Sequence, residues 1–168
     1  STRDRIVKIS PDGSVGIFAD CGPGKPIDFA PGYPTKIDID KYGNIYVGCA
    51  GYYDNRYNPS GDMLDTIYKI TPSGAISIVA RQRISEWSNI FYDPLGLAIS
   101  PDGERYLFVG DGWTPHDILK LDLLTKTSTQ FATTVYRPYD LLFDKEGNLF
   151  VSMSVTSSGK QNIYRFAP

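Results

Sequence analysis

The sequence predicts an all-β fold, an arc of a β-propeller built from antiparallel sheets of four strands each. Two observations support this class. The 168 residues are 41% hydrophobic and 13% aromatic and include 16 glycines and 12 prolines, a composition typical of strands joined by tight turns. Two strand–turn–strand units also recur in alternation, and four short strands in about 44 to 60 residues is the period of a propeller blade.

The first recurring unit begins with a proline and contains two apolar strands. Its copies are PTKIDIDKYGNIYVG (Pro34–Gly48), PLGLAISPDGERYLFVG (Pro94–Gly110) and PYDLLFDKEGNLFVS (Pro138–Ser152). Each copy has a glycine in its turn, where a positive φ costs glycine little: Gly43, Gly103 and Gly147. The near-continuous apolar run that ends each copy indicates a strand covered on both sheet faces.

The second recurring unit follows the first and also consists of two strands around a polar turn. Its copies are RIVKISPDGSVGIFA (Arg5–Ala19), TIYKITPSGAISIVA (Thr66–Ala80) and DILKLDLLTKTSTQFA (Asp117–Ala132), with a shortened copy, NIYRFAP (Asn162–Pro168). Apolar and polar residues alternate in these strands, as expected for hairpins.

The two units organise the chain as one incomplete propeller of 13 strands. Residues 1–20 supply the third and fourth strands of a blade, residues 34–80 and 94–132 each supply a blade, and residues 138–168 supply an incomplete blade. A β-sandwich is the alternative fold, but it does not explain why the same pair of hairpins recurs.

An arc of about three blades is too small to close a ring, because propellers usually need at least four. We therefore expect another propeller arc as a partner. Two sources remain open: a second copy in a homodimer, or a missing N-terminal part of a longer chain. Unpaired strand edges on an isolated arc favour a partner in either case.

The charge balance and hydropathy exclude two classes of partner. Seventeen basic and 19 acidic residues give a formal charge of −2 without a basic stripe, so we expect no nucleic-acid binding. No run is long and apolar enough to cross a membrane, so no membrane partner is expected. The sequence does not assign a compartment; a soluble protein, secreted or periplasmic, is favoured.

The repeat carries a family resemblance. The pattern P-x-x-h-x-h-D-x-x-G-N-h-[YF]-V, where h is apolar, occurs at Pro34–Val47 and Pro138–Val151 and resembles the NHL-repeat propellers. The segment GLAISPDGERYLFVGD (Gly96–Asp111) is similar to the superfamily of senescence-marker protein 30, gluconolactonase and strictosidine synthase. The resemblance covers nearly the whole chain and implies about half of a six-bladed propeller.

The lactonase members of this superfamily imply a divalent metal ion on the propeller axis, held near the starts of the innermost strands. The matching positions here are Leu95 and Tyr139, which are unsuitable ligands for calcium. Asp140 is one residue away, which in a strand turns it to the other face. We therefore predict no metal site in this part of the chain and no cofactor, with a bound calcium ion as the alternative.

Loops on one propeller face are the expected binding surface, because function concentrates on loops held by a rigid scaffold. The loop of residues 48–65 carries Tyr52, Tyr53, Asn55 and Tyr57, and aromatic rings beside polar groups suit carbohydrate or peptide recognition. The alternative is that the tyrosines only pack this loop on its neighbour. An EF-hand calcium loop is disfavoured, because Arg56 stands where an oxygen ligand is needed.

A second candidate group follows the strand that ends at Asp111. Trp113 and His116 lie in the same short loop, so the three side chains could converge. His116 could act as a general base or metal ligand, and a structural role is the alternative. Tyr139 is a further binding candidate at the start of an innermost strand. No catalytic residue is predicted, because no GxSxG nucleophile motif is present.

The resulting hypothesis is a non-catalytic module that binds a small molecule, carbohydrate or peptide, or another protein, on its loop face and needs a partner arc. The alternative from another class is part of a metal-dependent lactonase or hydrolase of the gluconolactonase type.

Overall fold

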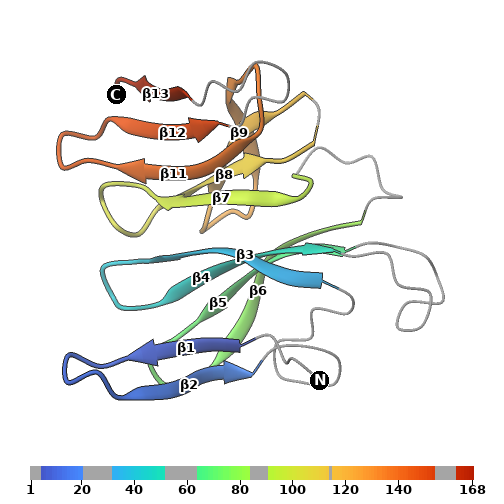
Figure 1. Cartoon of the computed structure of the whole chain (residues 1–168). Coiled ribbons are helices and arrows are strands. Elements are labelled where there is room, and N and C mark those ends of the chain that lie inside the picture. Colours follow the sequence, from blue (N-terminus) through green and yellow to red (C-terminus); the bar gives the residue numbers. More distant parts are fainter. Residues whose placement is uncertain (1–4, 21–31, 52–63, 84–90, 114, 154–161) are drawn as a thin grey trace.

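Antiparallel strands form the sheets of this chain in sequence order (Figure 1). The computed structural model describes residues 5–20, 32–51, 64–83, 91–113, 115–153 and 162–168. The strands in these residues are β1 (Arg5–Ile9), β2 (Val15–Asp20), β3 (Gly32–Ile39), β4 (Ile45–Gly51), β5 (Leu64–Ile70), β6 (Ile76–Arg83), β7 (Pro94–Ile99), β8 (Tyr106–Asp111), β9 (Asp117–Asp122), β10 (Ser128–Thr133), β11 (Pro138–Phe143), β12 (Leu149–Met153) and β13 (Asn162–Phe166).

The sheet order follows the recurring units. Within the described residues, β3-β4-β5-β6 and β7-β8-β9-β10 are four-stranded, β11-β12-β13 is three-stranded and β1-β2 is two-stranded. The predicted all-β class with antiparallel four-stranded units is confirmed. These residues form no helix that could span a bilayer.

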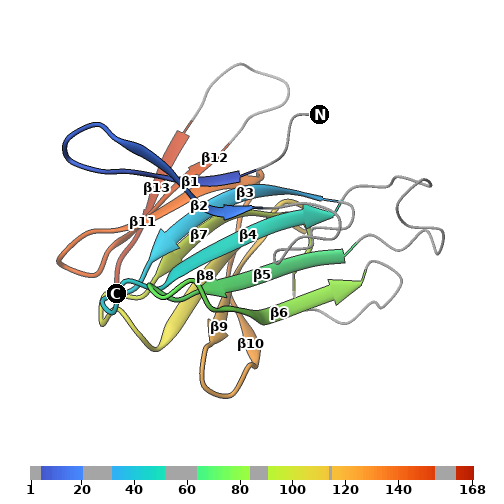
Figure 2. The same cartoon turned by 90° about the horizontal axis from the view of Figure 1, so that it is seen from below.

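The edge strands β3, β7 and β11 lie beside one another, and their sheets extend away from this common edge (Figures 1 and 2). The turns that follow these strands lie on one side of the molecule, at the left in Figure 1. The starts of β3, β7 and β11 lie on the opposite side, which we call the loop face.

Apolar side chains fill the space between successive sheets. Each interior sheet is therefore covered on both faces. Between the β3–β6 and β7–β10 sheets the core contains Tyr46, Ile67, Val79, Phe91, Leu97, Ile99, Leu107, Val109, Leu119 and Leu121. A second core joins β1–β2 to the β3–β6 sheet, and a third joins the last two sheets. The cores hold the loop-face ends of the sheets in fixed relative positions.

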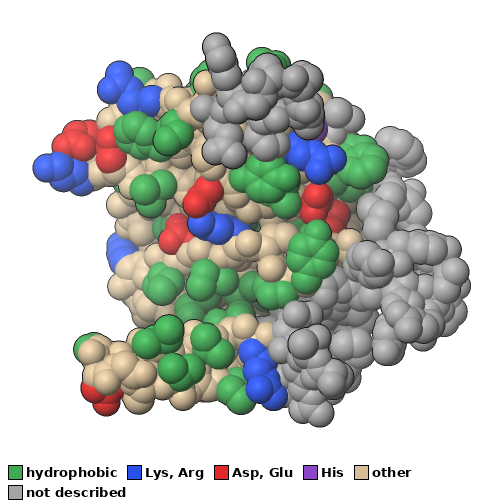
Figure 3. Space-filling model, in the orientation of Figure 1, with side chains coloured by type: hydrophobic (Ala, Val, Ile, Leu, Met, Phe, Trp, Pro, Cys, Tyr) green, Lys and Arg blue, Asp and Glu red, His purple; other side chains and the backbone are tan. Residues whose placement is uncertain are grey.

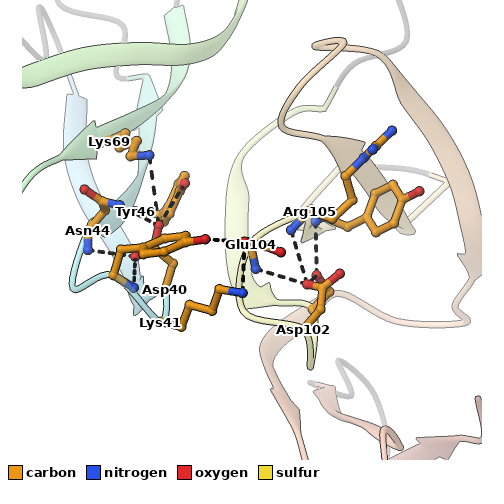
Figure 4. Close-up of polar contacts among 11 residues, drawn as sticks. Asp40, Lys41, Asn44, Tyr46, Lys69, Asp102, Glu104 and Arg105 are labelled. Carbon is orange, nitrogen blue, oxygen red and sulfur yellow. Dashed lines mark hydrogen bonds and ion pairs between the residues drawn. The ribbon is translucent and has the colours of Figure 1, made fainter.

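The turns after the innermost strands owe their shape to glycine and, in the first of them, to the buried carboxylate of Asp40. Gly43, Gly103 and Gly147 have φ of 80°, 73° and 87°, as the repeat predicts. Asp40 Oδ1 accepts a hydrogen bond from the Asn44 backbone N–H (2.8 Å), and Asn44 Nδ2 donates to Asp40 Oδ2 (2.7 Å). Figure 4 shows this network beside the pair of Lys41 Nζ and Glu104 Oε2, 2.9 Å apart, which joins neighbouring sheets.

Glycine also permits a close approach between sheets. A Cβ added to Gly110 in β8 would lie 2.6 Å from the carbonyl oxygen of Pro138, and one added to Gly48 would lie 3.1 Å from that of Pro94. The two glycines hold the same place in the repeat, as does Ser152. At this position of the repeat, the absence of a side chain lets the first strand of the next sheet lie close to the glycine backbone.

Candidate functional site

The residues that precede the three repeat prolines lie at equivalent positions on the loop face, at the starts of adjacent strands. They are Tyr33, Asp93 and Arg137, at the starts of β3, β7 and β11. Partial burial raises the pKa of Tyr33, and the Asp93 carboxylate acts in the same direction. Burial also raises the pKa of Asp93, while the Arg137 guanidinium opposes this shift. A phenol, a carboxylate and a guanidinium thus interact electrostatically along the inner edge of the sheets.

A β-bulge follows each of these prolines. The pairing register shifts between Pro34 and Lys36, between Pro94 and Gly96, and between Pro138 and Asp140. The extra residues are Thr35, Leu95 and Tyr139. Bulges change the direction of a side chain at a strand end. The exposed Tyr139 phenol also contributes to the raised pKa of Tyr33, which places these two rings in one neighbourhood.

A buried carboxylate near the start of β5, that of Asp65, hydrogen-bonds the backbone at the start of β7. Asp65 Oδ1 accepts a hydrogen bond from the Gly51 N–H (2.8 Å), and Asp65 Oδ2 accepts one from the Asp93 N–H (3.0 Å). Burial raises the pKa of Asp65 to about 6, although these hydrogen bonds favour the charged form. Asp65 therefore fixes the backbone at Asp93 from the neighbouring sheet.

Asp111 supports the same segment from the other side. The Trp113 N–H donates to Asp111 Oδ1 (2.8 Å), and the Tyr92 backbone also hydrogen-bonds this carboxylate. Burial raises the pKa of Asp111 to about 7, and the charges of Asp117 and Asp65 add to the shift. The role of Asp111 seen in the structure is thus to hold backbone from two segments.

The segment of Tyr92 and Asp93 is held between these two carboxylates in an unusual conformation. Asp93 has a φ of 51°, which is uncommon for a residue other than glycine. The Gly112 N–H adds hydrogen bonds to the carbonyl oxygens of Tyr92 and Asp93, both 3.0 Å long. Asp93 is thus fixed by Asp65 from the neighbouring sheet and by Gly112 from its own sheet, and strained residues that their surroundings fix in this way are often found at binding sites.

Asp111, Trp113 and His116 lie in one turn, and each hydrogen bond that the structure shows among them involves a backbone group. The His116 N–H donates to the Trp113 carbonyl oxygen (2.6 Å), and the Trp113 side chain is exposed. His116 has a φ of 56°, and its buried Nδ1 has no hydrogen-bond partner among the described residues.

The residues at the implied metal position do not fit a metal ion. The bulge side chains there are a threonine, a leucine and a tyrosine, of which Leu95 offers no ligand atom. In the part of the chain that the structure describes, no three His, Cys, Asp or Glu side chains are grouped so that they could hold one. Asp140 instead contacts Lys36, with Nζ and Oδ1 2.6 Å apart. We therefore derive no chemistry through a metal.

Four of the predicted candidates, Tyr52, Tyr53, Asn55 and Tyr57, lie outside the described residues. The structure adds Tyr33, Asp65, Asp93 and Arg137, which the sequence reasoning did not select. The signal for three of them was present, because each directly precedes a repeat proline.

Comparison with solved structures places this architecture among propellers. The chain superposes on the gluconolactonase of Xanthomonas campestris with a TM-score of 0.67 and 20% identity, over 97% of this chain and 52% of that one. A candidate gluconolactonase gives a TM-score of 0.62 and 18% identity, over 95% and 55% of the two chains. The extracellular domain of a candidate hybrid two-component system of B. thetaiotaomicron gives 0.50 and 19%, over 90% and 17%.

No protein-family model and no curated protein sequence matches the chain. The chain spans about half the length of the gluconolactonase structures that it matches. At this level of identity the likeness concerns the fold. The chain has the fold of about half of a six-bladed, gluconolactonase-like β-propeller.

Proposed function

We propose that this chain is a non-catalytic propeller module that binds a small polar molecule on its loop face, together with a partner arc that completes the ring. A carbohydrate is the ligand class that suits this face best. Aromatic rings can cover its apolar faces, and a carboxylate beside a guanidinium can hydrogen-bond its hydroxyl groups.

The observation that carries the proposal is the place of Tyr33, Asp93 and Arg137 at equivalent positions of successive sheets, where the Asp93 carboxylate acts electrostatically on the Tyr33 phenol and the Arg137 guanidinium acts on Asp93. Asp65 accepts a hydrogen bond from the N–H of the strained Asp93, and Asp111 holds the backbone of the preceding residue, Tyr92. The binding groups are therefore preorganised by buried contacts, which lowers the entropy lost when a ligand binds. Tyr139 and Trp113 add exposed aromatic surface at the same end of the sheets.

A hydrolase or lactonase is the second candidate. Two observations favour it: the fold likeness to gluconolactonase, and the raised pKa values of Asp65 and Asp111, since perturbed carboxylates often mark catalytic sites. Against it, both carboxylates already accept hydrogen bonds from backbone groups.

Saturation-transfer NMR with D-glucose, D-glucuronate and the peptide Gly-Tyr-Gly tests the binding proposal. We expect transfer to at least one sugar and its loss in Arg137→Gln and Tyr139→Ala. Lys145→Gln is a matched control, because its side chain is 90% exposed in a turn on the opposite side. Absence of transfer from every probe would refute the proposal.

The same samples separate the two functions. Incubation with δ-gluconolactone and calcium in a pH-stat should release no acid above the uncatalysed rate. Hydrolysis that disappears in Asp111→Asn would establish the enzyme instead.

A further inference from the structure

Two isoleucines of β3 are exposed although their neighbours on the same sheet face are covered. Ile37 and Ile39 are 46% and 56% exposed. They pair directly with Val47 and Ile45 of β4, so all four side chains share one face. Val47 is fully buried in the core that the β1–β2 sheet forms with β4 and β5. The β1–β2 sheet therefore covers this face over β4 and β5 but not over β3.

The repeat shows that these positions belong in a core. Leu97 and Ile99 of β7 hold the places of Ile37 and Ile39, and they are only 1% and 7% exposed. They are buried because the β3–β6 sheet, complete with its inner strands, packs against them. Ile37 and Ile39 would be buried in the same way if the β1–β2 sheet had two more strands on its inner side.

The β1–β2 sheet is built to be extended on that side. Ile6 and Ala19 pack on β4 and β5 as the outer strands of a blade do. Among the described residues β1 pairs with β2 alone, so no described strand lies along its inner edge. An unpaired edge offers backbone N–H and C=O groups to an incoming strand. Figure 3 shows hydrophobic side chains gathered over the region of β1, β2 and β3.

We propose that an antiparallel β-hairpin from a partner arc that is not a second copy of this chain adds to β1 and covers Ile37 and Ile39, which completes the first sheet as a four-stranded blade. The inference rests on the partner arc of the proposed function and names where it docks. The uncovered surface is continuous with the packed interface between β1–β2 and β4–β5. The matching gluconolactonase structure also extends for about half its length beyond the aligned part.

The repeat also specifies the chemistry of this hairpin. Ala98 of β7 and Phe108 of β8 are the inner-strand residues that pack on the following sheet, in one core with Leu141. Leu141 holds the place of Ile37 in its own sheet. The incoming hairpin therefore carries apolar side chains at alternate positions on the face turned toward β3.

A fusion tests this directly. A second copy of the Pro94–Asp111 hairpin is joined before Ser1 by a flexible linker, which gives it a high effective concentration near β1. We expect the thermal midpoint of the fused chain to rise by roughly 5–10 °C, since two large apolar side chains and a strand edge become covered. In hydrogen exchange, the β1 amides should become protected.

Four controls make the test specific. A fusion in which the added copy has aspartate in place of Phe108 should give no rise. In the active fusion, Ile39→Lys should remove the rise, whereas Leu124→Lys, at a residue that is 74% exposed in the turn after β9, should keep it. The unfused Ile39→Lys chain shows whether the variant folds.

Two outcomes overturn the inference. One is an unchanged midpoint and unchanged exchange at β1 in the active fusion. The other is an unfused chain that is a dimer in sedimentation equilibrium and becomes a monomer in Ile39→Lys, because a second copy would then be the occupant. If the chain binds sugar but the fusion does not stabilise it, the docking inference fails and the proposed ligand binding stands. If the fusion stabilises the chain but no sugar binds, only the proposed ligand binding is refuted.

Discussion

Replacement of Gly110 by alanine tests the packing of successive sheets. The new Cβ would lie 2.6 Å from the Pro138 carbonyl oxygen and 3.0 Å from Leu141 Cδ1. The leucine can change its rotamer, but the oxygen belongs to the backbone of β11, so one strand must move. Overpacking of this kind costs about 1–3 kcal/mol, and the lower chain entropy of alanine in the unfolded state offsets about 0.5–1 kcal/mol of it.

The net destabilisation should be about 0–2.5 kcal/mol, which corresponds to a fall in Tm of up to roughly 10 °C for a chain of this size. Urea unfolding followed by tryptophan fluorescence and circular dichroism measures it. Gly16→Ala is the matched control, because no atom lies within 4 Å of the Cβ that it adds. Gly48→Ala should fall between the two, since its closest contact is 3.1 Å. A Gly110→Ala chain as stable as Gly16→Ala would refute the reasoning.

Two further predictions concern buried carboxylates. The pKa of Asp111 is raised from 3.8 to about 7, so the folded state binds this proton more tightly than the unfolded state and the free energy of unfolding should decrease as pH rises from about 4 to about 7. Asp111→Asn should reduce this decrease by on the order of 2–4 kcal/mol, and a pH profile as steep as that of the parent chain would contradict this. Asp40→Ala should cost about 2–4 kcal/mol, because it removes the buried acceptor of the Asn44 hydrogen bonds. Asp12→Ala, at an exposed carboxylate of a similar turn, should cost clearly less, and equal losses for the two variants would argue against the buried network.

The repeat was sufficient to predict the fold because each unit contains both its strands and its turn. Gly43 and Gly147 could be assigned to turns without a structure, since each stands between apolar runs that alternate with a period of two. The family resemblance added the expected size of the ring, and the solved gluconolactonase structures support it.

The candidate site was harder to predict, because it depends on contacts between blades. Asp93 and Arg137 are about 44 residues apart in the sequence, and only the packing of β7 beside β11 makes them neighbours. The β-bulges after the prolines could not be predicted either, because one copy of the repeat has no sequence pattern specific to a bulge. The prediction for Asp111 was incomplete for a similar reason: the carboxylate holds Tyr92, which enters from the preceding loop.

Chemical-shift mapping of a ¹⁵N-labelled chain titrated with D-glucuronate and D-glucose is the most direct test of the central claim, that the loop face is the binding surface. The account predicts that the amides of Tyr33, Asp93, Trp113 and Tyr139 shift with saturable dependence on the sugar. Shifts confined to the turns at Asp40, Asp102 and Asp144, on the opposite side of the molecule, would contradict it.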